Sequence, residues 1–401
     1  MSMIREYGGE FSDPDLLVCL SKFDGENKQQ QELGPFSDQI HILGSDVQGR
    51  YFTHALASCK YLPPVRFLLH RRAMQRIWED GGRCIHLYRG EEYLPNARAV
   101  AELVQHQDFW SGKALSGQPV EHIHQLIITV PASSVVRAFA SIRDRVDART
   151  SICLVQDGLG VVEALNETYF PDPTSRPAYL LGHMTHQLYP VQDSMFSLSE
   201  VKQGRLYLSA LRGDLGHSRI RYHPPVERWS KPGHFLGLLT STPGLQAGGF
   251  PLEKFLNFKL PSTVFKSVVD PLTVILDCTY DKLAGNTYAR QMMDQLLGEI
   301  LNVVARLPEL RGYAKFNDLR GGGLRKDVFE RLARKKDGDS RMRSLIRRGW
   351  EGDIDFLNGY FVKRGREVGV KCPANETVIW MVKARHAAQL AQRREEIAFE
   401  R

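Results

Sequence analysis

Residues 262–278 read Ser262-Thr-Val-Phe-Lys266-Ser-Val-Val-Asp270-Pro-Leu-Thr-Val-Ile-Leu-Asp-Cys278. Apolar residues recur through this stretch at helical spacing, and we expect a helix over residues 262–276. Ser262, Lys266 and Asp270 are four residues apart, so they lie one above another on a single helix face. The stretch therefore predicts a packed helix with three polar side chains on one side.

The sequence before this helix predicts an α/β domain. Residues 40–44 and 65–70 are expected as short apolar strands, and residues 50–57 between them as an amphipathic helix. A strand–helix–strand unit of this kind requires parallel strands. The pattern continues with strands expected at residues 125–130, 151–156, 179–182 and 205–211, and a helix around residues 134–146.

The sequence after the Gly/Pro-rich stretch 241–251 predicts helices throughout. They are expected at residues 262–276, 286–307, 326–335, 354–368 and 376–397. We therefore divide the chain into an acidic, poorly ordered extension (1–38), an α/β domain (39–240) and an all-helical domain (250–397).

The composition is that of a globular protein. The 401 residues are 42% hydrophobic and 25% charged, which is enough to build a large core. The six cysteines are spread along the chain without the paired spacing of metal ligands or disulfides, so we expect no metal site. No apolar run reaches the length that spans a bilayer, and we expect no membrane insertion.

The charge of the chain favours an anionic partner. Residues 1–40 hold three basic and eight acidic side chains, so the rest of the chain is more basic than the net charge of +7. Cations are dense between residues 311 and 348, where phosphate groups of RNA or another anion could bind. The alternative is solvated helix faces, because acids are interleaved with the bases. The candidate anion-binding residues are Arg325, Lys326, Arg334, Lys335, Lys336, Arg347 and Arg348.

Four segments accompany the helix at 262–278 in a recognisable order. They are Ile40-His-Ile-Leu-Gly-Ser-Asp-Val-Gln-Gly49, Leu154-Val-Gln-Asp-Gly-Leu-Gly-Val161, Gly182-His-Met-Thr-His186 and Asp353-Ile-Asp-Phe-Leu-Asn-Gly-Tyr-Phe-Val362. Together they resemble the ketopantoate reductases over residues 39–385. The resemblance implies a Rossmann-like NADP-binding-type domain, then an all-α domain like the C-terminal domain of 6-phosphogluconate dehydrogenase, with the active site between them.

The dinucleotide loop of that family is altered here. In the family, Gly-x-Gly-x-x-Gly lets backbone N–H groups approach the cofactor pyrophosphate. This chain keeps Gly44 and Gly49 but has Asp46 in the middle, where like charges about 4 Å apart would cost on the order of 4 kcal/mol at an effective dielectric near 20. We interpret Asp46 as a helix N-cap. Arg71 and Arg72 either meet the 2′-phosphate of NADP, as the resemblance implies, or are solvated surface charges.

The resemblance also places the family's catalytic residues on this chain. The lysine that protonates the forming alkoxide corresponds to Ser262, and two asparagines correspond to Lys266 and Asp270. Lys266 either has moved into the acid role or forms an i,i+4 salt bridge with Asp270, and we favour the salt bridge. The substrate-binding glutamate corresponds to Asp353, which either binds substrate or caps the helix beginning at Ile354.

Two further positions lose the chemistry of the family. Pro131 stands where the family has a lysine, and Asp157 replaces an asparagine. A proline offers neither a cation nor a backbone donor, and an added acid repels a carboxylate substrate. We therefore expect the fold of the family without its reaction.

Two functions follow from this reading. The favoured one is a non-catalytic protein without cofactor, similar to the fungal cytochrome b mRNA translational activators, which resemble degenerate members of the family. That resemblance implies a mitochondrial ribosome or mRNA as partner and a mitochondrial location, although the sequence has no recognisable presequence. The alternative is an active, cytoplasmic NADPH-dependent 2-dehydropantoate 2-reductase, or a reductase of a related 2-oxo acid, that uses Lys266 and Asp353.

Overall fold

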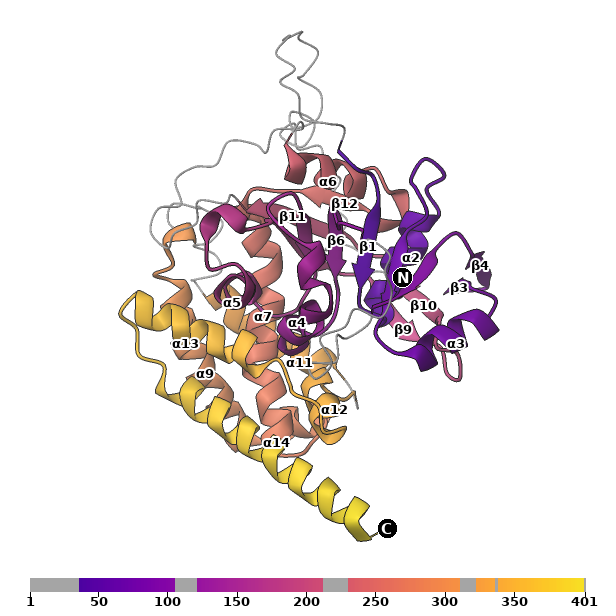
Figure 1. Cartoon of the computed structure of the whole chain (residues 1–401). Coiled ribbons are helices and arrows are strands. Elements are labelled where there is room, and N and C mark those ends of the chain that lie inside the picture. The colour runs from indigo at the N-terminus through magenta and orange to yellow at the C-terminus, as the bar shows by residue number, and fades with distance from the viewer. Residues whose placement is uncertain (1–35, 105–120, 212–229, 311–321, 336–337, 400–401) are drawn as a thin grey trace, which may run out of the picture.

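The computed structural model describes residues 36–104, 121–211, 230–310, 322–335 and 338–399 (Figure 1). The acidic extension expected over residues 1–38 lies outside the described residues up to residue 35.

An eight-stranded sheet forms the centre of the first domain, in the order β12-β11-β8-β7-β6-β1-β2-β5. The six strands from β8 to β5 are parallel, as the strand–helix–strand pattern predicts. β11 runs antiparallel to β8, and β12 pairs with β11 at the edge. The strands are β1 (Ile40–Leu43), β2 (Arg66–Leu69), β5 (Val100–Leu103), β6 (Gln125–Ile128), β7 (Ser151–Leu154), β8 (Ala178–Met184), β11 (Leu206–Leu211) and β12 (Ala247–Gly249).

Helices cover both faces of this sheet, and each face has its own core. Successive strand residues point to opposite faces, so Ile42 and Leu43 of β1 belong to different clusters. α2 (Val47–Ala57) and α6 (Lys231–Thr240) pack on the face of Ile42. α4 (Ala132–Phe139), the 3₁₀ turn η1 (Ala140–Arg145) and α5 (Val161–Tyr169) pack on the face of Leu43.

A second sheet, in the order β4-β3-β10-β9, lies beside α2 and α3 (Arg72–Asp80) (Figure 1). The sequence pattern predicts none of its strands. Its strands carry polar and proline residues on their outer face, which hides the alternation that marks a half-buried strand. The strands are β3 (Ile85–Arg89), β4 (Glu92–Asn96), β9 (Gln187–Pro190) and β10 (Ser197–Lys202).

The second domain is helical and packs around α7 (Leu252–Ile275). α7 begins at Leu252 rather than at residue 262, because the helix continues through Pro261 as well as Pro271. The expected helix at 354–368 divides into the turn η6 (Ile354–Phe356) and α13 (Asn358–Glu367). The remaining elements are α8 (Tyr280–Gly285), α9 (Thr287–Val304), η4 (Pro308–Leu310), α11 (Leu324–Arg334), α12 (Arg341–Arg347) and α14 (Pro373–Phe399).

The stretch 241–251 joins the two domains and also contributes to the sheet. It forms the turn η3 (Pro243–Leu245) and the edge strand β12, which pairs with β11. The chain then enters α7 directly. In the described ranges, no helix is both long and apolar enough to cross a bilayer.

Candidate functional site

The turn between β1 and α2 combines two glycines with one carboxylate. Gly44 has φ +138°, which side chains rarely adopt, and a Cβ on Gly49 would collide with the carbonyl of Gly44. Oδ1 of Asp46 accepts hydrogen bonds from the backbone N–H of Gly49 (2.9 Å) and from the hydroxyl of Thr129 (2.7 Å). The predicted N-cap at Asp46 is therefore confirmed. This helix terminus already holds an anion, its own carboxylate, at the place where such loops receive phosphate.

Cations of the helical domain reach across to the acids of the α/β domain. Arg341, the first residue of α12, lies with Nη2 3.5 Å from Oδ2 of Asp46 and Nη1 3.8 Å from Oδ2 of Asp157. Nζ of Lys266 on α7 is 2.5 Å from the same oxygen of Asp157. Burial opposes ionisation of Asp157, but Lys266 and Arg341 outweigh it and hold the pKa of this carboxyl well below its usual range. We call these four residues the ionic network.

The expected salt bridge between Lys266 and Asp270 is wrong. Lys266 contacts Asp157 across the domain interface, whereas the buried carboxylate of Asp270 accepts a hydrogen bond from the hydroxyl of Tyr280 (2.9 Å). Burial raises the pKa of Asp270 to about 6, although Lys266 opposes the shift. Asp270 turns toward α8 while the half-buried amine of Lys266 turns toward the cleft, so their spacing on the helix does not bring them together.

Asp353 is buried and caps a helix of the other domain. Its Oδ1 accepts a hydrogen bond from the backbone N–H of Ser133 (2.9 Å), in the first turn of α4. The N-cap residue of α4 is Pro131, which has no side chain able to accept this hydrogen bond. The prediction that Asp353 caps the turn beginning at Ile354 is wrong, because its side chain makes no such bond there.

Lys259 on α7 is the residue that the sequence analysis missed. It lies one turn before Ser262, is 2% exposed, and donates a hydrogen bond to the carbonyl oxygen of Gln156. Burial lowers the pKa of its ammonium to about 8, although Asp157 opposes the shift. The available signal was the position of this lysine between the apolar residues Phe258 and Leu260. Ser262 itself is half-buried.

Arg71 and Arg72 lie where the resemblance places a phosphate-binding cation. Both are exposed at the start of α3, directly after β2. The turn of the dinucleotide loop is close by, because the hydroxyl of Ser45 lies 3.9 Å from the sulfur of Met74 on α3.

The basic segment is not a continuous strip of unpaired cations. Several of its side chains already have intramolecular partners, which agrees with the alternative of solvated helix faces interleaved with acids. Lys336 lies outside the described residues, and Arg348 is exposed. The partners are Asp294 for Arg325, Glu330 for Lys326 (3.7 Å), the carbonyl of Glu330 for Arg334 (3.2 Å), the ring of Tyr280 for Lys335 (4.9 Å) and Asp277 for Arg347 (2.9 Å).

Among the described residues, no group of three or more histidine, cysteine, aspartate or glutamate side chains could hold a metal ion.

Comparison with family models decides the ancestry of the chain. Residues 40–213 match the model of ketopantoate reductase PanE/ApbA, and residues 256–386 match the model of its C-terminal domain. The chain belongs to the ketopantoate reductase family. The first match falls in the α/β sheet domain and the second in the helical domain, so the predicted fold class is confirmed.

Relatives within the ketopantoate reductase family are distant. A probable 2-dehydropantoate 2-reductase of Schizosaccharomyces pombe is 21% identical over 87% of this chain and 97% of its own length. The 2-dehydropantoate 2-reductase of Saccharomyces cerevisiae is 22% identical over 86% of this chain and 93% of its own. The cytochrome B translational activator of S. cerevisiae is 21% identical over 68% of this chain and 76% of its own.

Solved structures of ketopantoate reductases share the fold. The probable 2-dehydropantoate 2-reductase of Bacillus subtilis superposes with a TM-score of 0.58 at 17% identity, covering 86% of this chain and 99% of its own.

Proposed function

We propose that this member of the ketopantoate reductase family has lost the reductase reaction and acts as a binding protein in translation. The observation that carries the proposal is the ionic network. Its acids and cations neutralise one another across the interface between the domains, where the family is expected to hold cofactor and substrate.

The residues present do not fit a dinucleotide phosphate. A pyrophosphate at the turn after β1 would have to displace the carboxylate of Asp46 from the N–H of Gly49 and draw Arg341 away from two acids. Each lost contact would leave a charge without its counter-charge, and the phosphates would lie beside Asp46 itself. We therefore propose that NADPH is not a cofactor of this chain.

The substrate side of the cleft supports the same conclusion. Ser262 cannot readily supply the proton that the family's lysine provides, and Asp353 is occupied by the N–H of Ser133. A carboxylate substrate would also meet the carboxylate of Asp157.

The role in translation rests on analogy with the cytochrome B translational activator, which matches this chain over 302 residues. The net charge of +7 supports an RNA or ribosomal partner. By this analogy, the partner is a mitochondrial mRNA or the mitochondrial ribosome, and the protein works in mitochondria.

The test of the lost reaction uses the purified full chain. A ligand at one hundred times its Kd adds about 2.7 kcal/mol to the free energy of unfolding, so a functional site would give a clear melting shift with millimolar NADPH. We expect no shift and no oxidation of NADPH in the presence of 2-dehydropantoate. A shift together with turnover would overturn the proposal.

The second candidate function, an active reductase, is favoured by Lys259. This buried lysine lies one turn from Ser262, and its ammonium is suited to proton transfer near neutral pH. If the protein does turn over, loss of activity in Lys259→Met but not in Lys266→Ala would assign the acid to Lys259 and exclude the displaced Lys266.

The role in translation is tested by crosslinking RNA to the protein in cells. We expect RNA to be recovered, and recovery to fall when Lys326, Arg334 and Arg348 are changed to glutamine. The matched control changes three exposed cations outside the basic segment, Lys60, Arg76 and Lys202, and should leave recovery unchanged. Absence of crosslinked RNA and of ribosome co-sedimentation would reject this role.

A further inference from the structure

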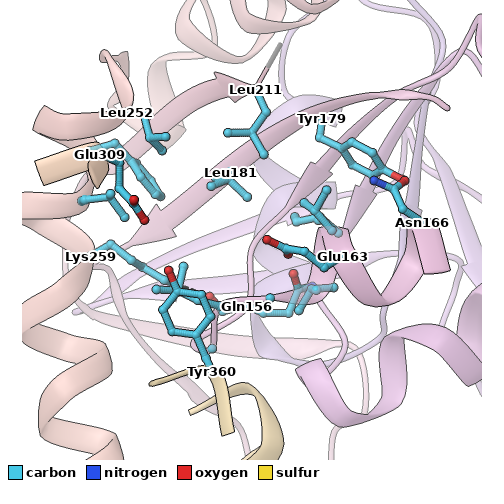
Figure 2. Close-up of a pocket in the computed structure, with 18 of the residues that line it drawn as sticks. Gln156, Glu163, Asn166, Tyr179, Leu181, Leu211, Leu252, Lys259, Glu309 and Tyr360 are labelled. Atoms are coloured by element: carbon cyan, nitrogen blue, oxygen red, sulfur yellow. Dashed lines mark hydrogen bonds between the residues drawn. The ribbon is translucent and has the colours of Figure 1, made fainter. Parts of the chain in front are cut away.

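A cavity of about 460 Å³ lies between the sheet and the helical domain (Figure 2). Its walls come from β7, β8, α5, the first turns of α7, and α13. Ligand pockets usually have volumes of roughly 300–1,000 Å³, so this one can hold a small organic molecule. It borders the ionic network: Gln156 and Gly158, on either side of Asp157, line the cavity, but none of the four residues of the network does.

Most of the cavity wall is apolar. Leu181 and Leu211 project from the sheet, and Leu252 projects from α7 (Figure 2). Phe255 and Leu256 of α7 also line the cavity. Burying an aliphatic or aromatic group against this surface is favourable by about 25 cal/mol per Å². The body of a matching ligand is therefore apolar.

Two opposite charges face the cavity from different helices. Lys259 enters from α7, and the carboxylate of Glu163 points into the cavity from α5 (Figure 2). The ammonium of Lys259 donates one hydrogen bond, to the carbonyl of Gln156, and keeps two N–H groups for another acceptor. Within the described residues, neither Lys259 nor Glu163 has an ion-pair partner within 4.0 Å.

Most of the other charged side chains at the cavity have partners within the protein. Arg364 makes two hydrogen bonds to the carboxylate of Glu309 (2.9 and 2.8 Å), and Glu167 pairs with Lys363 (2.9 Å). Arg176 in the wall has no carboxylate partner among the described residues, but its guanidinium donates hydrogen bonds to the carbonyl oxygens of Phe170 (3.0 Å) and Pro171 (3.3 Å). Lys259 and Glu163 are therefore the pair of opposite charges that can select the charges of a ligand.

We propose that this cavity binds a small apolar zwitterion, whose carboxylate meets Lys259 and whose ammonium meets Glu163. A buried ammonium gains most from an anion that brings its own hydrogen-bond acceptors, because water is excluded from the contact. A plain carboxylate would be repelled by Glu163, and a plain amine by Lys259. The inference does not depend on the loss of the reductase reaction, although Lys259 is also the acid of the second candidate function.

The experiment measures binding to the full-length protein by isothermal titration calorimetry. Leucine and 6-aminohexanoate are the probes, because they present the two charges at a short and a long separation. 4-Methylpentanoate lacks the ammonium and 3-methylbutylamine lacks the carboxylate. We expect one zwitterion to bind at least tenfold more tightly than both single-charge analogues.

Variants assign the charges to their residues. Lys259→Met should abolish the preference for the carboxylate, and Glu163→Gln the preference for the ammonium. Leu181→Trp should fill the cavity and abolish binding, whereas Lys254→Met, on α7 but outside the cavity wall, should leave binding unchanged. If neither zwitterion binds more tightly than the analogues, or if both charge variants bind normally, the proposal is overturned. Glu163→Gln keeps the test decisive if Lys259→Met does not fold, since Glu163 is only half-buried.

Discussion

The side-chain amide of Asn358 donates a hydrogen bond of 2.8 Å to the carbonyl oxygen of Ser267. In an uninterrupted helix this oxygen would accept from the N–H four residues later, but residue 271 is proline and has none. Asn358 is fully buried, and its amide also donates to Oδ1 of Asn375 (2.9 Å). Two sequence segments that carry the family resemblance, Asp270-Pro271 and Leu357-Asn358-Gly359, therefore meet as acceptor and donor.

We predict that Asn358→Ala lowers the free energy of unfolding by about 1–3 kcal/mol, because it leaves a buried carbonyl without a donor. Urea denaturation measures the change. Pro271→Ala restores a backbone N–H to the helix, so the double variant should lose less than the sum of the two single changes. Additive losses would show that Asn358 does not serve this carbonyl.

We predict that Asp353→Ala costs about 0.5–2 kcal/mol of stability, the usual cost of losing a helix N-cap. The loss arises at α4, since the carboxylate binds the N–H of Ser133. Asp355→Ala is the matched control: it removes an exposed pair with Lys383 and should cost no more than about 1 kcal/mol. Equal effects in the two variants, measured by urea denaturation, would argue against the cap.

We predict that Asp46→Gly combined with Asp157→Asn gives the protein a melting shift with NADPH. The double change restores the middle glycine of the loop and frees Arg341 and Lys266 to meet phosphate. The control, Asp294→Asn, removes an acid that pairs with Arg325 on the surface. The unchanged protein and the control should show no shift. If the double variant also fails to respond, the ionic network is not what prevents nucleotide binding.

We predict that the stability contributed by Lys259 rises with pH. Its pKa falls from an ordinary 10.5 to about 8 in the folded chain, so between these values the unfolded chain binds more protons. The free energy of unfolding of the unchanged protein should therefore rise relative to that of Lys259→Met between pH 8 and 10. Lys254→Met, on the same helix, gives the reference for the loss of a lysine side chain. A constant difference for Lys259→Met would contradict the lowered pKa.

Local signals in the sequence were enough for the positions of the main strands along the chain and for the N-cap at Asp46. The apolar runs that form β1, β2, β6 and β7 lie in the buried centre of the sheet, where both faces are covered and the runs stand out. Asp46 caps the helix that follows it directly, so the cap depends on neighbouring residues alone.

Contacts between the domains could not be predicted in the same way. The i,i+4 spacing suggests Asp270 as the partner of Lys266, but Asp157, more than one hundred residues away, is closer in space. Arg341 belongs to a run of cations that looks like solvated surface, and only the packing of α12 brings it to Asp46. Such pairs depend on how two domains dock, which periodicity does not encode.

Arg341 also links the two domains electrostatically, because it reaches from the helical domain to two carboxylates of the α/β domain. Moving the α/β domain and the helical domain apart would leave Asp46 and Asp157 without Arg341, the cation that they share. The distances from Arg341 to Asp46 (3.5 Å) and to Asp157 (3.8 Å) are well below the screening length of about 8 Å at physiological ionic strength. Physiological salt therefore screens these two contacts only weakly. Molar salt, with a screening length near 3 Å, should weaken both contacts of Arg341.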